Sequence, residues 1–193
     1  PPRESRVGAQ ARRGDRRPAE IAYERLLEDE GRSFLFTPFA NYAEGNLDVC
    51  RQMIAHPNTV IGLGDGGAHV TVISDASFPT FLLSHWGRDA ENGFDVSWLV
   101  KRQTSATAGV VGFHNRGVTA RGMKADLNLI DMRRLGLESP RMHADLPAGG
   151  RRLLQPSTGY VATIVSGQMV YRDGGATQAL PGKLVRGPQA AAC

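Results

Sequence analysis

The stretch TVIGLGDGGAHV, residues 59–70, decides the fold. Its first part, TVIGL, is a short apolar run, and such runs predict parallel strands that are buried on both faces. The run leads into GDGG, where Asp65 is the only acid among glycines. Because glycine has no Cβ, the chain can turn sharply here and a ligand can approach the backbone closely. The stretch therefore predicts a strand that ends at an exposed carboxylate.

The residues before this stretch alternate between helix and strand patterns. Pro18 and Gly31 bracket a predicted helix whose apolar residues fall on one face: Ala19, Ala22, Tyr23, Leu26 and Leu27. SFLFT (33–37) predicts a second buried strand, closed by Pro38. A further helix is expected around Leu47, Cys50 and Ile54, with its end at Pro57. Strands and helices that alternate at this spacing indicate a parallel sheet with helical crossovers.

A parallel sheet assigns a position to Asp65. Ligands and catalytic groups collect at the carboxyl ends of parallel strands, and Asp65 follows the end of TVIGL. One alternative is that Asp65 only caps the next helix at a tight turn. A phosphate-cradling loop is a weaker alternative, because neither GxGxxG nor the lysine-containing phosphate-loop pattern occurs here.

After the loop, helices give way to strands. A helix is expected over Asp75–Asp89, with Phe78, Phe81, Leu82 and His85 near one side. Asp95 is a predicted N-cap, and Ser105 is a second one for a short helix of small residues. The runs Arg116–Met132 and Gly159–Gly174 are rich in Val, Ile and Leu and predict a small sheet, with a hairpin around Ser166-Gly167.

Composition and charge restrict the function classes. Residues 1–17 contain six arginines and two acids, so they carry the whole net charge of +4 and the rest is neutral. We expect a disordered Arg-rich arm, for which phosphate contacts stay an alternative, and no nucleic-acid partner. No apolar run approaches the length of a membrane span, so no membrane partner is expected. The two cysteines, Cys50 and Cys193, form no framework, which favours a cytoplasmic protein.

Several motifs in combination carry a family resemblance. The GDG acid is followed by KRQTSATAGVVGF (101–113), RGVTARGMKADLNLID (116–131), IVSGQMVYRDG (164–174) and LPGKLVRG (180–187). In this order they resemble the C-terminal part of the amidohydrolase superfamily, and within it the N-acyl-D-amino-acid deacylases (D-aminoacylases). The resemblance covers about residues 18–187.

The resemblance implies an α/β fold: the C-terminal portion of a (β/α)8 metal-dependent hydrolase barrel, followed by strands of a small β-sandwich. The implied ranges are a disordered arm (1–17), the last β/α units (18–115), a sandwich segment (116–187) and a tail (188–193). It also implies that Asp65 is the catalytic base at the end of the eighth strand and a metal ligand, with Zn²⁺ as cofactor of the intact enzyme. The expected substrate is a small-molecule amide. His69, four residues later, is expected either to contact it or to anchor the loop by a hydrogen bond.

The sequence also departs from the family pattern. No HxH pair occurs, and the other histidines, His56, His85, His114 and His143, are expected to be surface or packing residues. The loop VTVISDASFPT (70–80) lacks the arginine that D-aminoacylases use for the substrate carboxylate. We therefore expect that this chain alone retains no zinc.

Since the chain begins at Pro1, it is expected to be a fragment of a longer enzyme or a reading frame begun late. A non-catalytic remnant that acts as an interaction module is the alternative function. Uncovered apolar surfaces predict self-association.

Overall fold

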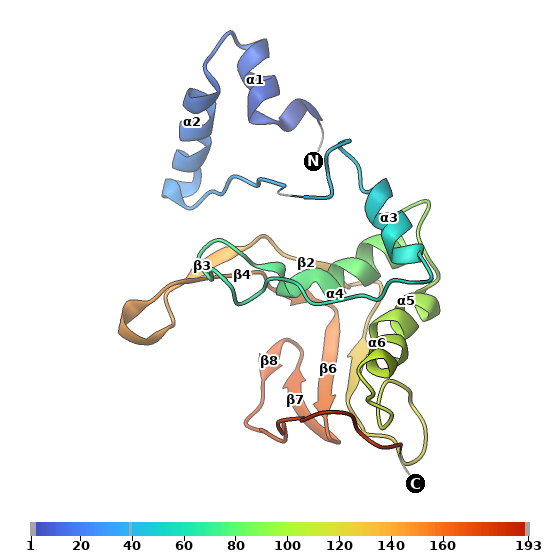
Figure 1. Ribbon diagram of the computed structural model, residues 1–193. Helices are drawn as coiled ribbons and strands as arrows, with labels where there is room; N and C mark the ends of the chain where they lie inside the picture. Colours follow the sequence, from blue (N-terminus) through green and yellow to red (C-terminus); the bar gives the residue numbers. More distant parts are fainter. Residues whose placement is uncertain (1–2, 39, 192–193) are drawn as a thin grey trace. The chain divides into compact units, whose positions relative to one another are not determined.

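Helices make up the regular structure of the first third of the chain. The computed structural model describes residues 3–38 and 40–191. Contacts between residues divide the chain into two units, Pro1–Thr59 and Val60–Cys193. The helical segments of the first unit are η1 (Arg3–Ser5), α1 (Val7–Arg13), α2 (Pro18–Gly31) and α3 (Asp48–Ala55) (Figure 1).

The Arg-rich arm is helical, which corrects the expectation of disorder. Helix α1 packs on α2, and Ala11 and Ile21 are their buried side chains, at 2% and 7% exposure. Because α1 presents one small apolar residue to its neighbour and not an apolar stripe, the periodicity of the sequence gives no sign of it. The arm and α2 therefore belong to one unit. This division at residues 59 and 60 differs from the boundaries predicted at residues 17 and 115. The predicted domain assignment stays a prediction.

Helix α2 is found where it is expected, but its predicted apolar face is not buried. Pro18 occupies the first turn, as predicted. Tyr23, Leu26 and Leu27 are 65%, 44% and 55% exposed, because α1 covers Ile21 on another side of the helix. The predicted helix around Cys50 is also present, as α3.

The two predicted buried strands differ from the structure. Residues 33–37 and 59–63 are coil, and no pairing is found for them within residues 3–38 and 40–191. Phe36 and Leu63 are 77% and 98% exposed. An extended segment becomes a strand only when a neighbour accepts and donates its backbone hydrogen bonds. Without such a neighbour, apolar character alone does not produce one.

The first helical segment of the second unit is continuous over the predicted range 75–89. It passes through a 3₁₀ turn η2 (Asp75–Ser77), α4 (Phe78–Phe81) and a π-helix η3 (Leu82–Asp89). Helices α5 (Val96–Gln103) and α6 (Ser105–Val110) follow. The Asp95 carboxylate accepts a hydrogen bond from the Trp98 amide at 3.0 Å, so the predicted N-cap is confirmed. Ser105 is wrong as a cap: Thr104 holds that position, and its side chain makes no capping bond.

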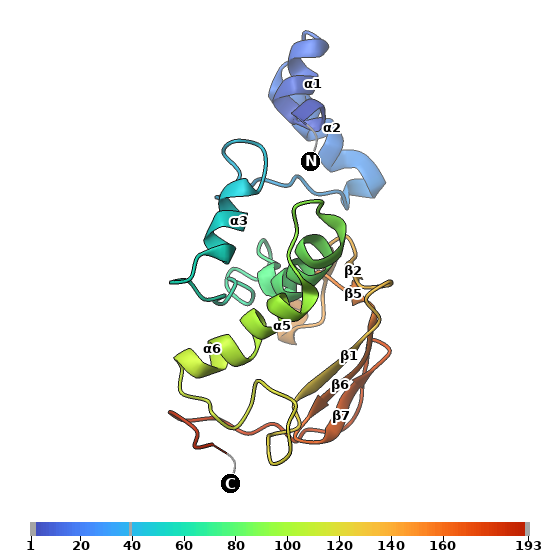
Figure 2. The ribbon, with the colours of Figure 1, turned by 90° about the vertical axis from the view of Figure 1, so that its right-hand side faces the viewer.

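The strands that follow pair antiparallel in three small sheets. The largest has the order β1-β6-β7-β8, and the pairs β2-β5 and β3-β4 form the other two (Figures 1 and 2). Their bounds are β1 (Leu127–Ile130), β2 (Gly136–Leu137), β3 (Arg141–His143), β4 (Arg152–Leu154), β5 (Ser157–Thr158), β6 (Tyr160–Val165), β7 (Gln168–Arg172) and β8 (Gly175–Ala176), with a 3₁₀ turn η4 (Pro147–Gly149) before β4.

The predicted hairpin is confirmed. It joins β6 to β7 through Ser166 and Gly167, whose φ angles of 50° and 79° are the positive values that a type I′ turn requires. The run 116–132 is shorter as a strand than expected, because only Leu127–Ile130 pairs with β6. The chain therefore has the mixed helix and strand content of the predicted α/β class.

A small apolar core joins the helices of the second unit to its strands. Leu82, Leu83, Trp86, Leu99 and Leu135 are buried. The Arg88 guanidinium donates to the backbone carbonyls of Met132 and Leu135 at 2.8 and 2.6 Å. These contacts hold the helical segment 75–89 to the connection between β1 and β2, and this segment in turn supports the Asp65 loop.

Candidate active site

Asp65 lies in an exposed loop at the start of the second unit. Its backbone carbonyl accepts a hydrogen bond from the Ala68 amide at 2.9 Å, which closes a tight turn. Its carboxylate makes no hydrogen bond or ion pair within the described parts of the chain. An exposed carboxylate without a partner can accept a proton from water or from a ligand.

The glycines beside Asp65 are required by close packing. A Cβ on Gly64 would stand 2.8 Å from the Asp75 carbonyl oxygen, and one on Gly66 would stand 2.7 Å from the Ala76 amide nitrogen. Such distances are shorter than a side chain tolerates, so the loop lies against the first turn of the following helical segment because these residues are glycine. Gly67 has a φ of 98°, which also favours glycine.

The helix-capping alternative for Asp65 does not describe the structure. The next helical turn, η2, has Ser74 at its N-cap position and no side-chain capping bond. The Asp65 carboxylate therefore stays free for other chemistry. The packing of the loop on Asp75 and Ala76 is a backbone contact, and it fixes the position of Asp65 without using its side chain.

His69 turns the chain out of the Asp65 loop. Its φ is 43°, and its carbonyl accepts hydrogen bonds from the amides of Val72 and Ile73 at 2.8 and 3.2 Å. The loop is thus anchored by the backbone of His69. Its imidazole is exposed and has no hydrogen-bond partner among the residues that the structure describes. The predicted substrate contact stays a prediction.

The loop and the helical turn after it are tied to the strands. The Leu153 amide donates to the Val70 carbonyl at 2.6 Å, and the Ser77 hydroxyl donates to the Gln155 side-chain carbonyl at 2.6 Å. The Thr80 and Tyr160 hydroxyls share a hydrogen bond of 2.9 Å. Residues 153–160, which are far along the chain, therefore hold the loop and the following helical turn in place.

The residues present do not form a metal centre by themselves. Over residues 3–38 and 40–191, no group of three or more His, Cys, Asp and Glu side chains lies close enough to hold an ion. A zinc site takes three or four protein ligands. The zinc that the resemblance implies therefore does not fit the described residues alone, and Asp65 as a metal ligand stays a prediction.

Two of the other histidines have side-chain contacts that do not involve the loop. His85 stacks on Phe81, with ring centroids 4.8 Å apart, and meets the edge of Trp86 at 4.7 Å. His56 accepts a hydrogen bond from the Asn58 amide at 3.2 Å. His85 is thus a packing residue, as the sequence predicts for it.

Comparison with known proteins identifies the family of the chain. A model of the amidohydrolase family matches residues 20–171, a range that contains Asp65, His69 and most of the strands. Since the match spans well over half of the chain, the chain belongs to the amidohydrolase family. A search of curated proteins and a search of solved structures each found no match. No helix of the described residues is long and apolar enough to cross a membrane.

Proposed function

We propose that this chain supplies the catalytic carboxylate of an amidohydrolase that cleaves a C–N amide bond. This carboxylate is Asp65, which acts as the general base. The observation that carries the proposal is the position of Asp65. It is a free, exposed carboxylate on a glycine loop, inside the range that matches the family. The (β/α)8 barrel portion and the β-sandwich remain the proposed fold of the complete enzyme.

The chemistry follows from an amide and a water molecule. Asp65 takes a proton from water as the oxygen attacks the carbonyl carbon, and then passes that proton to the leaving nitrogen. The C–O bond forms, the C–N bond breaks, and the products are a carboxylate and an amine. His69, with an exposed imidazole four residues later, is proposed to contact the substrate.

The proposed substrates are N-acyl-D-amino acids or related small amides. The support is the ordered set of motifs at 101–113, 116–131, 164–174 and 180–187. The zinc of the complete enzyme is proposed to bind mainly through ligands outside these residues, because the described residues group no three donors. We propose a cytoplasmic enzyme with neither nucleic acid nor membrane as partner.

The test is the coding DNA upstream of the Pro1 codon, followed by expression of the continuous product. We expect an in-frame HxH pair, bound zinc in the product, and hydrolysis of N-acetyl-D-amino acids in preference to their L forms. Absence of any in-frame HxH would contradict the proposal that the chain is part of such an enzyme. If the product hydrolyses only other amides, the proposed reaction is supported and the proposed substrate class is contradicted.

A non-catalytic role is the second candidate, and uncovered apolar side chains favour it. Phe34, Leu35 and Phe36 are 49%, 41% and 77% exposed, and such a run fits an interaction module. Mixing the chain with the product of the coding sequence upstream of the Pro1 codon separates the two candidates. An enzyme segment gains zinc and hydrolytic activity on mixing, whereas an interaction module gains neither.

A further inference from the structure

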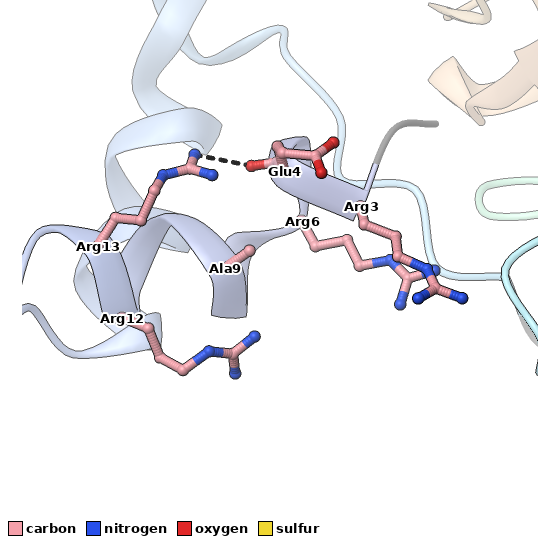
Figure 3. Close-up of a pocket in the computed structure, with 6 residues that line it drawn as sticks. All are labelled: Arg3, Glu4, Arg6, Ala9, Arg12 and Arg13. Carbon is pink, nitrogen blue, oxygen red and sulfur yellow. Dashed lines mark hydrogen bonds between the residues drawn. The ribbon is translucent and has the colours of Figure 1, made fainter.

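The N-terminal unit contains an open hollow lined mainly by arginines. Its volume is about 420 Å³, and its lining is Arg3, Glu4, Arg6, Ala9, Arg12 and Arg13 (Figure 3). Four cations and one carboxylate leave a net charge of +3 at the lining. We call this the arginine hollow.

The arginines of the hollow are not paired with carboxylates, unlike their neighbours in the same unit. Every other arginine from Arg16 to Arg32 has a carboxylate partner: Arg16 with Glu20 and Glu24, Arg17 with Glu20, Arg25 with Glu28, and Arg32 with Asp29 and Glu30. Arg3 and Arg13 donate only to the backbone carbonyls of Glu44 and Glu4, at 3.0 and 2.8 Å. For Arg6 and Arg12 the described residues offer no ion pair. Among the arginines from Arg3 to Arg32, those without a carboxylate partner in the described chain are therefore the ones that line the hollow.

Two of these guanidinium groups converge on one point. A Cβ on Gly45 would stand 3.0 Å from Nη2 of Arg6 and 3.3 Å from Nε of Arg3. Like charges repel each other, so an anion that contacts both guanidinium groups would offset this repulsion. The absence of a side chain at Gly45 leaves that space open, and no carboxylate of the described residues fills it.

We propose that the arginine hollow binds an oligophosphate, a chain of two or more linked phosphate groups. Guanidinium groups bind phosphate through paired N–H donors. Figure 3 shows the guanidinium groups of Arg3 and Arg6 close together and those of Arg12 and Arg13 pointing to other sides, so a chain of phosphates can reach more of these groups than a single phosphate can. The lining contains no aromatic side chain on which a base stacks, so the site favours the phosphate chain over a nucleic acid.

The experiment is titration of the full chain with sodium triphosphate, followed by calorimetry and by the arginine Nε–Hε signals in NMR spectra. We expect saturable binding that weakens as salt is added and that shifts the signals of Arg3, Arg6, Arg12 and Arg13. Orthophosphate at equal ionic strength is expected to bind at least about tenfold more weakly, because it engages fewer guanidinium groups.

A matched pair of variants distinguishes a specific triphosphate site from non-specific attraction of triphosphate to positive charge. Arg6→Ala/Arg12→Ala removes two unpaired cations and is expected to weaken triphosphate binding at least about tenfold. Arg17→Ala/Arg32→Ala removes the same charge from paired positions and is expected to leave binding within about twofold. Arg6→Lys/Arg12→Lys retains the charge without the paired donors and should give an intermediate affinity.

Several outcomes would overturn the proposal. These are no binding of triphosphate at low salt, equal weakening by both alanine pairs, and equal affinity for orthophosphate. Far-UV circular dichroism of each variant checks that α1 and α2 remain helical, and the lysine pair tests the site if the alanine pair unfolds. No hydrolysis is measured, so the result is independent of the role of Asp65.

Discussion

At the scale of single residues, the candidate site depends on one carboxylate and the glycines beside it. Gly64 and Gly66 let the loop approach Asp75 and Ala76 at distances that exclude a Cβ. Asp65 between them has no partner within the described chain, so its carboxylate is available. The glycines thus determine the position of the loop, and Asp65 supplies its carboxylate.

Asp65→Asn tests the proposed base. Asparagine retains the shape and a hydrogen-bonding oxygen but cannot take a proton, so turnover of an active enzyme containing this segment should fall by about 100-fold or more. The measurement is kcat for amide hydrolysis, with the metal content determined in parallel and expected to change little. Glu91→Gln, which neutralises another exposed acid outside the loop, is the control and should remain active. Near-normal hydrolysis by Asp65→Asn would assign the proton to another group.

At the scale of elements, Gly66→Ala tests the packing of the loop on η2. The new Cβ would stand 2.7 Å from the Ala76 amide nitrogen, so loop and helical turn must separate. We expect a loss of about 1–3 kcal/mol in the free energy of unfolding, measured by urea denaturation. Gly62→Ala is the matched control, since nothing lies within 4 Å of its Cβ position. Equal stability of both variants would show that the contact between loop and turn is not required.

The start of helix α5 gives a prediction about pH. The Ser97 hydroxyl and the Trp98 amide donate to the Asp95 carboxylate and lower its pKa in the folded protein. A carboxylate whose pKa is lower in the folded than in the unfolded protein stabilises the fold at pH values above its unfolded pKa of about 4. This stabilisation is lost as the pH falls through the lower pKa of the folded state.

Asp95→Ala should therefore lower the thermal midpoint by a few degrees at pH 7, with a gap to wild type that narrows below about pH 4. Thermal melts followed by circular dichroism over this pH range provide the measurement. Asp95→Asn retains a capping oxygen at every pH, so it should melt near wild type at pH 7. A gap for Asp95→Ala that is constant with pH would contradict the assignment to the charged cap.

At the scale of the whole molecule, exposed apolar side chains predict self-association. Phe34, Leu35 and Phe36 are large and exposed. Covering each such side chain is worth about 1.5–3 kcal/mol, against a typical total stability of about 5–15 kcal/mol. Sedimentation velocity over a range of concentrations should show oligomers, and Phe36→Ser should reduce them. Leu180→Ser, at 93% exposure and outside this run, is the control and should not. A monodisperse monomer at all concentrations would contradict the prediction.

Much of the local structure was predictable because it depends on local chemistry. Pro18 begins α2, Asp95 caps α5, and Ser166-Gly167 turns the hairpin, each through the backbone preference or side-chain acceptor of that residue. The family was also predictable, because its motifs follow one another in order along the chain. The position of Asp65 among glycines after an apolar run singled it out, and the family resemblance then implied its role as candidate base.

The remaining features depend on neighbours that local chemistry does not identify. SFLFT and TVIGL have the composition of buried strands, but they are coil because a strand forms only beside a partner. The Arg-rich arm lacks an apolar stripe, but it is helical because α2 covers Ala11. The sequence also does not distinguish the arginines that have a carboxylate partner from those that have none within the described residues.

By itself, then, the sequence determined the starts of α2 and α5, the hairpin, the family and the candidate base. The tertiary structure alone decided which face of α2 is buried, which backbone atoms the Asp65 loop touches, and which arginines lack a carboxylate. The physical reason is that caps and turns are settled by interactions a few residues apart. Burial, strand pairing and ion pairing are settled by atoms that only the folded chain brings together.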